Sequence, residues 1–213
     1  MSFDSRPAAA ACLIVAALAA GCASAPPAGK GLHQTPPTLG RYPYSDADVD
    51  FMSGMIPHHA QALIMAGWAP SHGARKDVAI LCERIVVGQR DEIALMQTWL
   101  SDRGLPVPDA TSTRHKMKMN GVEHEMLMPG MLTDEEMAAL DRARGPEFDR
   151  LFLLGMIKHH QGAVGMVDVL LKSYGAAQDE TIFKFANDVQ ADQSIEIDRM
   201  EKMLEAGGTR FNS

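Results

Sequence analysis

The sequence predicts an all-α protein: a four-helix bundle made of two duplicated helical hairpins with a long Met/His-rich crossover between them. Of its 213 residues, 46% are hydrophobic but only 6% are aromatic, which disfavours an aromatic-rich β-sandwich. The second observation is an internal repeat, and the third is the helical period of the apolar residues within each copy. We expect the bundle to span residues 46–206.

The repeat unit is a pair of segments. FMSGMIPHHAQALIM at 51–65 matches FLLGMIKHHQGAVGM at 152–166. Similarly, QRDEIALMQTWL at 89–100 matches QSIEIDRMEKML at 193–204. Each copy therefore supplies two helices, and two copies supply the four helices of a bundle.

The N-terminal residues are expected to be a lipoprotein signal peptide, residues 1–21. Arg6 precedes an uncharged run at 7–20 that is too short to span a membrane. Leu18 to Cys22 resembles the lipobox of bacterial lipoproteins, in which the cysteine takes the lipid, so Cys22 is the candidate lipidation site and membrane anchor. The alternative is simple secretion, with cleavage after Ala25.

A Pro/Ala/Gly-rich tether, residues 22–45, is expected to separate the anchor from the bundle. Residue 23 is Ala rather than Asp, and by resemblance to the sorting rule of two-membrane bacteria this favours an outer-membrane lipoprotein that faces the periplasm. Cys82 is then the sole cysteine of the mature domain, so no internal disulfide can form.

The remaining elements follow in chain order. Four long helices are expected at residues 46–68, 75–102, 147–174 and 179–206. Short turns join the helices within each copy and make each pair antiparallel. Repeat one is thus 46–102, the crossover 103–146 and repeat two 147–206. Within the crossover, Thr133 and Glu136 form a capping-box pattern that opens a short helix ending near Gly145.

Polar residues lie on the core side of all four predicted helices. A buried carboxylate without a partner costs several kcal/mol, so these groups must meet each other, water or a metal. Two histidines and a glutamate recur in both copies, with a methionine one helical turn before each histidine pair. This recurrence favours metal ligands supplied from facing helices. The candidate metal ligands of the core are Met55, His58, His59, Glu92, Met156, His159, His160 and Glu196. A hydrogen-bonded network that only fixes helix register remains the alternative.

The crossover sequence HKMKMNGVEHEMLMPGM at 115–131 alternates His and Met in a polar context. Thioether sulfur is a soft ligand that suits Cu(I) and Ag(I), and imidazole suits both copper oxidation states, so the segment suggests copper. The alternative is that its methionines cap the open end of the bundle. The candidate ligands here are His115, Met117, Met119, His124, Met126, Met128 and Met131.

The doubled MI-x-HH element, MPGM at 128–131 and GPEFDRLFLLGMIKHHQGAVGM at 145–166 resemble the bacterial "domain of unknown function 305" family. The resemblance covers about residues 44–206 and implies a ferritin-like four-helix bundle. For some family members it also implies periplasmic copper binding, carried here by the matching histidine pairs and the Met-rich crossover. In contrast to ferritins, the first helix of each hairpin has no glutamate beside its histidines.

These observations predict an envelope-anchored protein that binds metal, with copper the favoured ion, for sequestration or delivery without turnover. The net charge of −7 disfavours a nucleic-acid partner, and no nucleophile, phosphate loop or cofactor motif points to an enzyme. The alternatives are a metal-dependent oxidase on a ferritin-like bundle and a metal-free structural lipoprotein with a His/Glu hydrogen-bonded core.

Overall fold

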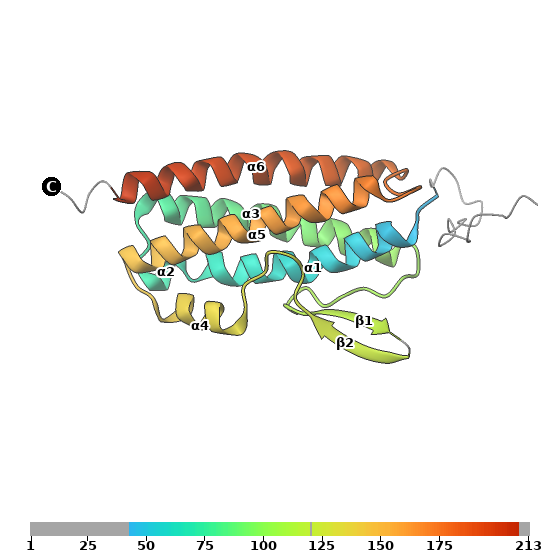
Figure 1. Ribbon diagram of the computed structural model, residues 1–213, viewed down its shortest axis with the longest axis horizontal. Helices are drawn as coiled ribbons and strands as arrows, with labels where there is room; N and C mark the ends of the chain where they lie inside the picture. The colour runs from blue at the N-terminus through green and yellow to red at the C-terminus, as the bar shows by residue number, and fades with distance from the viewer. Residues whose placement is uncertain (1–42, 120, 209–213) are drawn as a thin grey trace, which may run out of the picture.

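The computed structural model describes residues 43–119 and 121–208. Four long helices run side by side along the molecule (Figure 1). They are α1 (Asp46–Gly67), α3 (Lys76–Ser101), α5 (Pro146–Lys172) and α6 (Glu180–Gly208). The predicted helical bundle is confirmed. The expected signal peptide, Cys22 and nearly all of the tether lie outside the described residues.

The helices pair as the repeat predicts. Helix α1 packs chiefly on α3, α5 packs chiefly on α6, and α1 and α5 form the main contact between the two hairpins. Ser45 caps α1 through a capping box with Asp48, and the Asp48 carboxylate also accepts a 2.7 Å hydrogen bond from the Ala177 amide. The start of the first hairpin is therefore tied to the α5–α6 turn of the second.

Two short helices accompany the bundle. Helix α2 (Ala69–His72) lies in the α1–α3 turn, and α4 (Asp134–Arg142) begins at the predicted capping box of Thr133 and Glu136. Helix α4 packs on α5 and α1. None of the described helices is long and apolar enough to span a membrane.

The crossover contains a β-hairpin that the all-α prediction missed. Strands β1 (His115–Met119) and β2 (Val122–Met126) pair antiparallel and project from the bundle (Figure 1). Asn-Gly at 120–121 is a strong hairpin signal, and Gly121 has a φ of +80°, which glycine adopts without strain. The signal is in the sequence: residue types alternate with a period of two on both sides of this dipeptide.

Residues 128–132 (MPGML), the docked segment, cross the face of the bundle where α1 meets α5. Gln61 holds this segment by accepting from the Leu132 amide at 2.7 Å and donating to the Leu132 carbonyl at 2.9 Å. Gly130, at φ +78°, passes directly over Gly162: a Cβ on Gly162 would lie 2.0 Å from the Pro129 carbonyl oxygen. This close approach requires glycine at both positions.

Gly162→Ala is therefore expected to lower the free energy of unfolding by about 2 kcal/mol, because the added methyl group displaces the docked segment. Gly88→Ala, on the exposed face of α3, is the matched control. A Cβ there meets nothing within 4 Å, so the substitution should raise stability by roughly 0.5–1 kcal/mol through helix propensity. Urea unfolding measures both, and equal stability of the two variants would contradict the docking described above.

Candidate metal centre

Four histidines occupy the centre of the bundle. His58 and His59 of α1 and His159 and His160 of α5 are all fully buried, with 0% of their surface exposed. On α1 they lie between one apolar cluster that ends at Ile56 and a second that begins at Ala62, and the histidines of α5 separate the same two clusters. The structure thus places four polar side chains between two apolar cores.

The outer histidine of each pair contacts a glutamate of its own hairpin. His59 Nε2 lies 2.7 Å from a Glu92 carboxylate oxygen, and His160 Nε2 lies 2.7 Å from the equivalent oxygen of Glu196. The carboxylates are partly exposed, at 24% and 19%, so each pair extends from the buried centre toward solvent. The duplicated sequence therefore makes the same contact twice.

The inner histidines, His58 and His159, meet where the hairpins meet, with ring centroids 3.8 Å apart. His58 Nε2 donates to the Pro129 carbonyl of the docked segment at 3.0 Å, and His159 Nε2 donates to the His58 carbonyl at 2.9 Å. A carbonyl only accepts, so both rings must carry their proton on Nε2. Their Nδ1 atoms then hold a free lone pair.

None of the four Nδ1 atoms has a hydrogen-bond partner among the described residues, although all four are buried. His72 shows the contrast: it is also buried, but its Nδ1 meets the Ser71 hydroxyl at 2.9 Å and its Nε2 donates to the Asp141 carbonyl at 2.9 Å. Imidazoles that bind metal commonly donate one N–H to a carboxylate or carbonyl and present the other nitrogen to the ion. The core histidines have this arrangement.

Burial keeps the inner imidazoles neutral. Desolvation, followed by the neighbouring His59, lowers the pKa of His58 from 6.5 to about 3. Desolvation and the His58 ring likewise hold the pKa of His159 well below its ordinary value. Both rings are therefore uncharged at neutral pH, which is the form that ligates metal.

The buried thioethers nearest in sequence are those of Met55 and Met156, one helical turn before His58 and His159, and both are 0% exposed. Within residues 43–119 and 121–208, no three or more His, Cys, Asp or Glu side chains are grouped so as to hold a metal ion. The core thus offers buried imidazole nitrogens, but no three of them converge on one point in the described part of the chain.

The β-hairpin brings the crossover ligands onto one face. His115 pairs with Met126 and Met117 with His124, and directly opposed residues share a face of the ribbon. The other face carries Lys116, whose ammonium lies 3.3 Å from Glu123 and 3.2 Å from Glu125. Met119 continues the ligand face by register, but its side chain lies outside the described part of the chain.

His115 fixes this hairpin to α1. Pro57 has no N–H, which leaves the Ser53 carbonyl without its helical partner, and the His115 ring hydrogen-bonds to that carbonyl. Burial lowers the pKa of His115, opposed by Asp50 and by the Ser53 carbonyl. Met126 by contrast is 44% exposed, so the ligand face runs from the bundle surface out to solvent.

The methionines of the docked segment pack against the bundle. Met131 is 4% exposed, and its sulfur accepts the Met128 amide at 3.2 Å. The Met128 methyl group and the Met166 methyl group both lie over Gly54, whose missing side chain makes room for them. Met128 and Met131 therefore pack on the face of the bundle where α1 meets α5, and not at an open end.

Sequence reasoning missed two partners of the core histidines. The Pro129 carbonyl and the His58 carbonyl are backbone groups, and no side-chain pattern marks them. The carboxylates were found because Glu92 and Glu196 recur at equivalent positions. The Met166 thioether was seen as part of the repeat but not as a neighbour of Met128.

The fold and the histidine centre define a class of protein: a bundle of two duplicated helical hairpins with paired imidazoles buried between them. The chain belongs to the family described as "Domain of unknown function (DUF305)", which matches residues 48–204. A family member from Streptomyces coelicolor, described as a candidate secreted protein, superposes with a TM-score of 0.64 at 28% identity, over 76% of this chain and 94% of that one.

Two further proteins are similar to this chain. CopM in its Cu(I)-bound form superposes with a TM-score of 0.57 at 28% identity, over 75% of this chain and 96% of CopM. CopM structures with Cu(II) and with silver are similar to this chain as well. An uncharacterised protein of Acanthamoeba polyphaga mimivirus is 33% identical over 58 residues, which span 27% of this chain and 38% of that protein.

The buried imidazoles predict a pH dependence. As the pH falls below 6.5, the unfolded chain protonates His58 and His159, while the folded chain leaves His58 neutral down to a pKa of about 3 and holds the pKa of His159 well below its ordinary value; stability is therefore full above pH 6.5 and falls as the pH is lowered. The loss should be on the order of 1 kcal/mol per pH unit for each histidine.

Urea unfolding from pH 8 to pH 4 measures this slope. In His159→Gln the amide can still donate to the His58 carbonyl, so the slope should become shallower while folding persists. His124→Gln, on the exposed strand β2, is the control and should keep the wild-type slope. An unchanged slope in His159→Gln would contradict the buried neutral state.

Proposed function

We propose that the protein binds copper outside the cytosol and serves in its sequestration or delivery, without turnover. The observation that carries this proposal is the register of the β-hairpin, which sets two imidazoles and two thioethers, those of His115, Met117, His124 and Met126, side by side on one face. A set of two nitrogen and two sulfur donors suits copper, and Cu(I) in particular, better than Mg²⁺, Ca²⁺ or Mn²⁺.

The core histidines are the second part of the proposed site. Their donors toward an ion would be the Nδ1 atoms of His58, His59, His159 and His160, with Met55 and Met156 as thioether candidates. Thioethers and imidazoles suit Cu(I), so an imidazole of each pair with a thioether is the donor set we propose, and it does not need the group of three or more His, Cys, Asp or Glu side chains that the described residues lack. The copper and silver complexes of CopM support this choice of ion.

The geometry favours binding over oxidase chemistry. Di-iron oxidase centres of the ferritin type use inward-pointing carboxylates as direct ligands. Here Glu92 and Glu196 contact the Nε2 atoms of His59 and His160 at the outer ends of the cluster, 2.7 Å away. Their role in the proposed site is to orient the imidazoles and raise their basicity.

We further propose that residues 1–21 are a lipoprotein signal peptide, that Cys22 carries the lipid and that the tether holds the bundle at the outer membrane on its periplasmic side. The Streptomyces coelicolor relative, described as a candidate secreted protein, supports an extracytoplasmic location. A location outside the reducing cytosol also suits a protein whose proposed ligands are thioethers and imidazoles rather than thiolates.

Titration of the purified protein with Cu(I) in the presence of a competing chelator tests the copper proposal. Met117→Leu with Met126→Leu should remove the hairpin class of sites, and His58→Gln with His159→Gln should remove the core class. Each pair should weaken its class on the order of a hundredfold, since loss of an outer-shell partner alone costs 10–100-fold.

Two controls match these variants. Met137→Leu changes a partly buried methionine of α4, and His72→Gln changes a buried histidine whose two nitrogens are already partnered. Both should bind copper as the wild type does. Absence of Cu(I) binding by the wild type would favour the metal-free network, and oxygen consumption by the metal-loaded protein would favour the oxidase.

Lipidation is tested by Cys22→Ser in a host that processes bacterial lipoproteins. The variant should leave the membrane fraction or remain unprocessed, because only a thiol at this position accepts the lipid. Cys12→Ser, within the expected signal peptide, is the control and should be processed and anchored normally. Membrane association of Cys22→Ser equal to that of the control would refute the anchor.

A further inference from the structure

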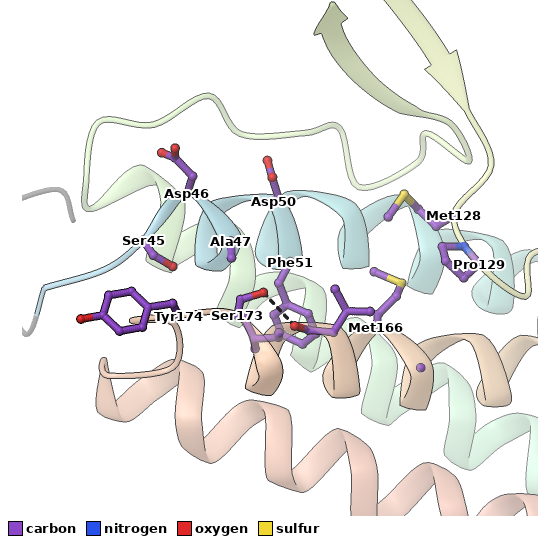
Figure 2. Close-up of a pocket in the computed structure, with 13 residues that line it drawn as sticks. Ser45, Asp46, Ala47, Asp50, Phe51, Met128, Pro129, Met166, Ser173 and Tyr174 are labelled. Atoms are coloured by element: carbon purple, nitrogen blue, oxygen red, sulfur yellow. Dashed lines mark hydrogen bonds between the residues drawn. The ribbon is translucent and has the colours of Figure 1, made fainter. Parts of the chain in front are cut away.

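An apolar groove of about 610 Å³ lies between the start of α1 and the end of α5 (Figure 2). Phe51, Met166 and Leu170 line its floor, and the docked segment closes one end with Met128. Val169 on its wall is 68% exposed and Tyr174 is 100% exposed. Within the described part of the chain, nothing fills this groove.

The duplication supplies an equivalent groove between the start of α5 and the end of α1. Positions 51 and 152 are equivalent, so the copies are offset by 101 residues, and the counterparts of Phe51, Met166 and Leu170 are Phe152, Met65 and Ala69. Those three residues are buried in one cluster with Leu140 of α4 and with Leu132. The second groove is therefore filled, and α4 fills it.

Helix α4 comes immediately before α5 in the chain, so its counterpart by position comes immediately before α1. The offset of 101 residues maps α4 onto residues 33–41 and places Leu39 opposite Leu140 and Arg41 opposite Arg142. Leu140 is the buried residue of α4, with 1% of its surface exposed. At these two positions the residue types of the two segments agree, whereas the other seven differ.

We propose that residues 33–42 of this chain occupy the open groove, with Leu39 in the place that Leu140 takes in the other copy. The described residues begin at Pro43, and Ser45, Asp46 and Ala47 line the groove. Residues 33–42 therefore join the described chain directly beside the groove. Pro36 and Pro37 exclude a helix like α4, so the occupant is an extended strand.

Charge also favours this occupant. Asp50 lies exposed at the groove's rim, and Arg41 is the counterpart of the α4 arginine, so the segment brings a cation to an acidic edge. A second copy of the chain would bring the same acidic rim against its own. The proposal is independent of copper binding, and it shortens the part of the tether left to span the distance to Cys22.

Thiol labelling of Val169→Cys in the full-length, membrane-anchored protein tests the proposal. Labelling by a bulky maleimide is measured at that peptide by mass spectrometry, so that Cys22 and Cys82 do not contribute. With the native segment, Val169→Cys should label about tenfold more slowly than when Leu39→Glu is added, since a carboxylate in place of the buried leucine releases the segment from the groove. Thr38→Glu is the matched control and should preserve the protection.

Val87→Cys, at a position 61% exposed on α3, reports general reactivity and should label quickly in every background. Circular dichroism checks that each variant keeps its helices, and Leu39→Ser repeats the test with a smaller change. Equal labelling at 169 with and without Leu39→Glu overturns the proposal. Protection that survives Leu39→Glu and grows with protein concentration also overturns it, because a second copy then fills the groove.

Discussion

The structure depends on the burial of four imidazoles between two hairpins. Each buried ring needs an acceptor for its Nε2 proton, because a buried donor left without a partner would cost about 1–3 kcal/mol. Glu92 and Glu196 serve the outer rings and thereby set how α3 lies against α1 and α6 against α5. The contacts of His58 and His159 fix the α1–α5 crossing, so the register of the bundle follows from this one requirement.

The same requirement explains the course of the crossover. His58 needs an acceptor, and the Pro129 carbonyl reaches it only if the docked segment lies against α5, where the glycines at 130 and 162 allow the two backbones to approach. Gln61 then satisfies both backbone groups of Leu132. The docked segment therefore both supplies hydrogen-bond partners to His58 and Gln61 and packs closely against α5.

Much of this arrangement could be predicted from the sequence. The repeat predicts the four long helices and their pairing, because helical period and short turns are local properties. The histidines and glutamates could be assigned to the core because they recur at equivalent positions. The backbone acceptors could not, since Pro129 and His58 act through carbonyls that every residue has. The β-hairpin has an Asn-Gly signal at 120–121, but its strands are rich in Lys and Glu, which have low β-propensity and favour a loop.

The docked segment has one further consequence, for the symmetry of the molecule. A single stretch of chain laid across the contact between two equivalent halves cannot treat both alike. Position 61 holds a glutamine that hydrogen-bonds to the docked segment. The equivalent position 162 holds a glycine, over which the docked segment passes. Two separate, identical hairpins would have to present the same residue at both places. Fusion of the copies into one polypeptide is what allowed these positions to diverge.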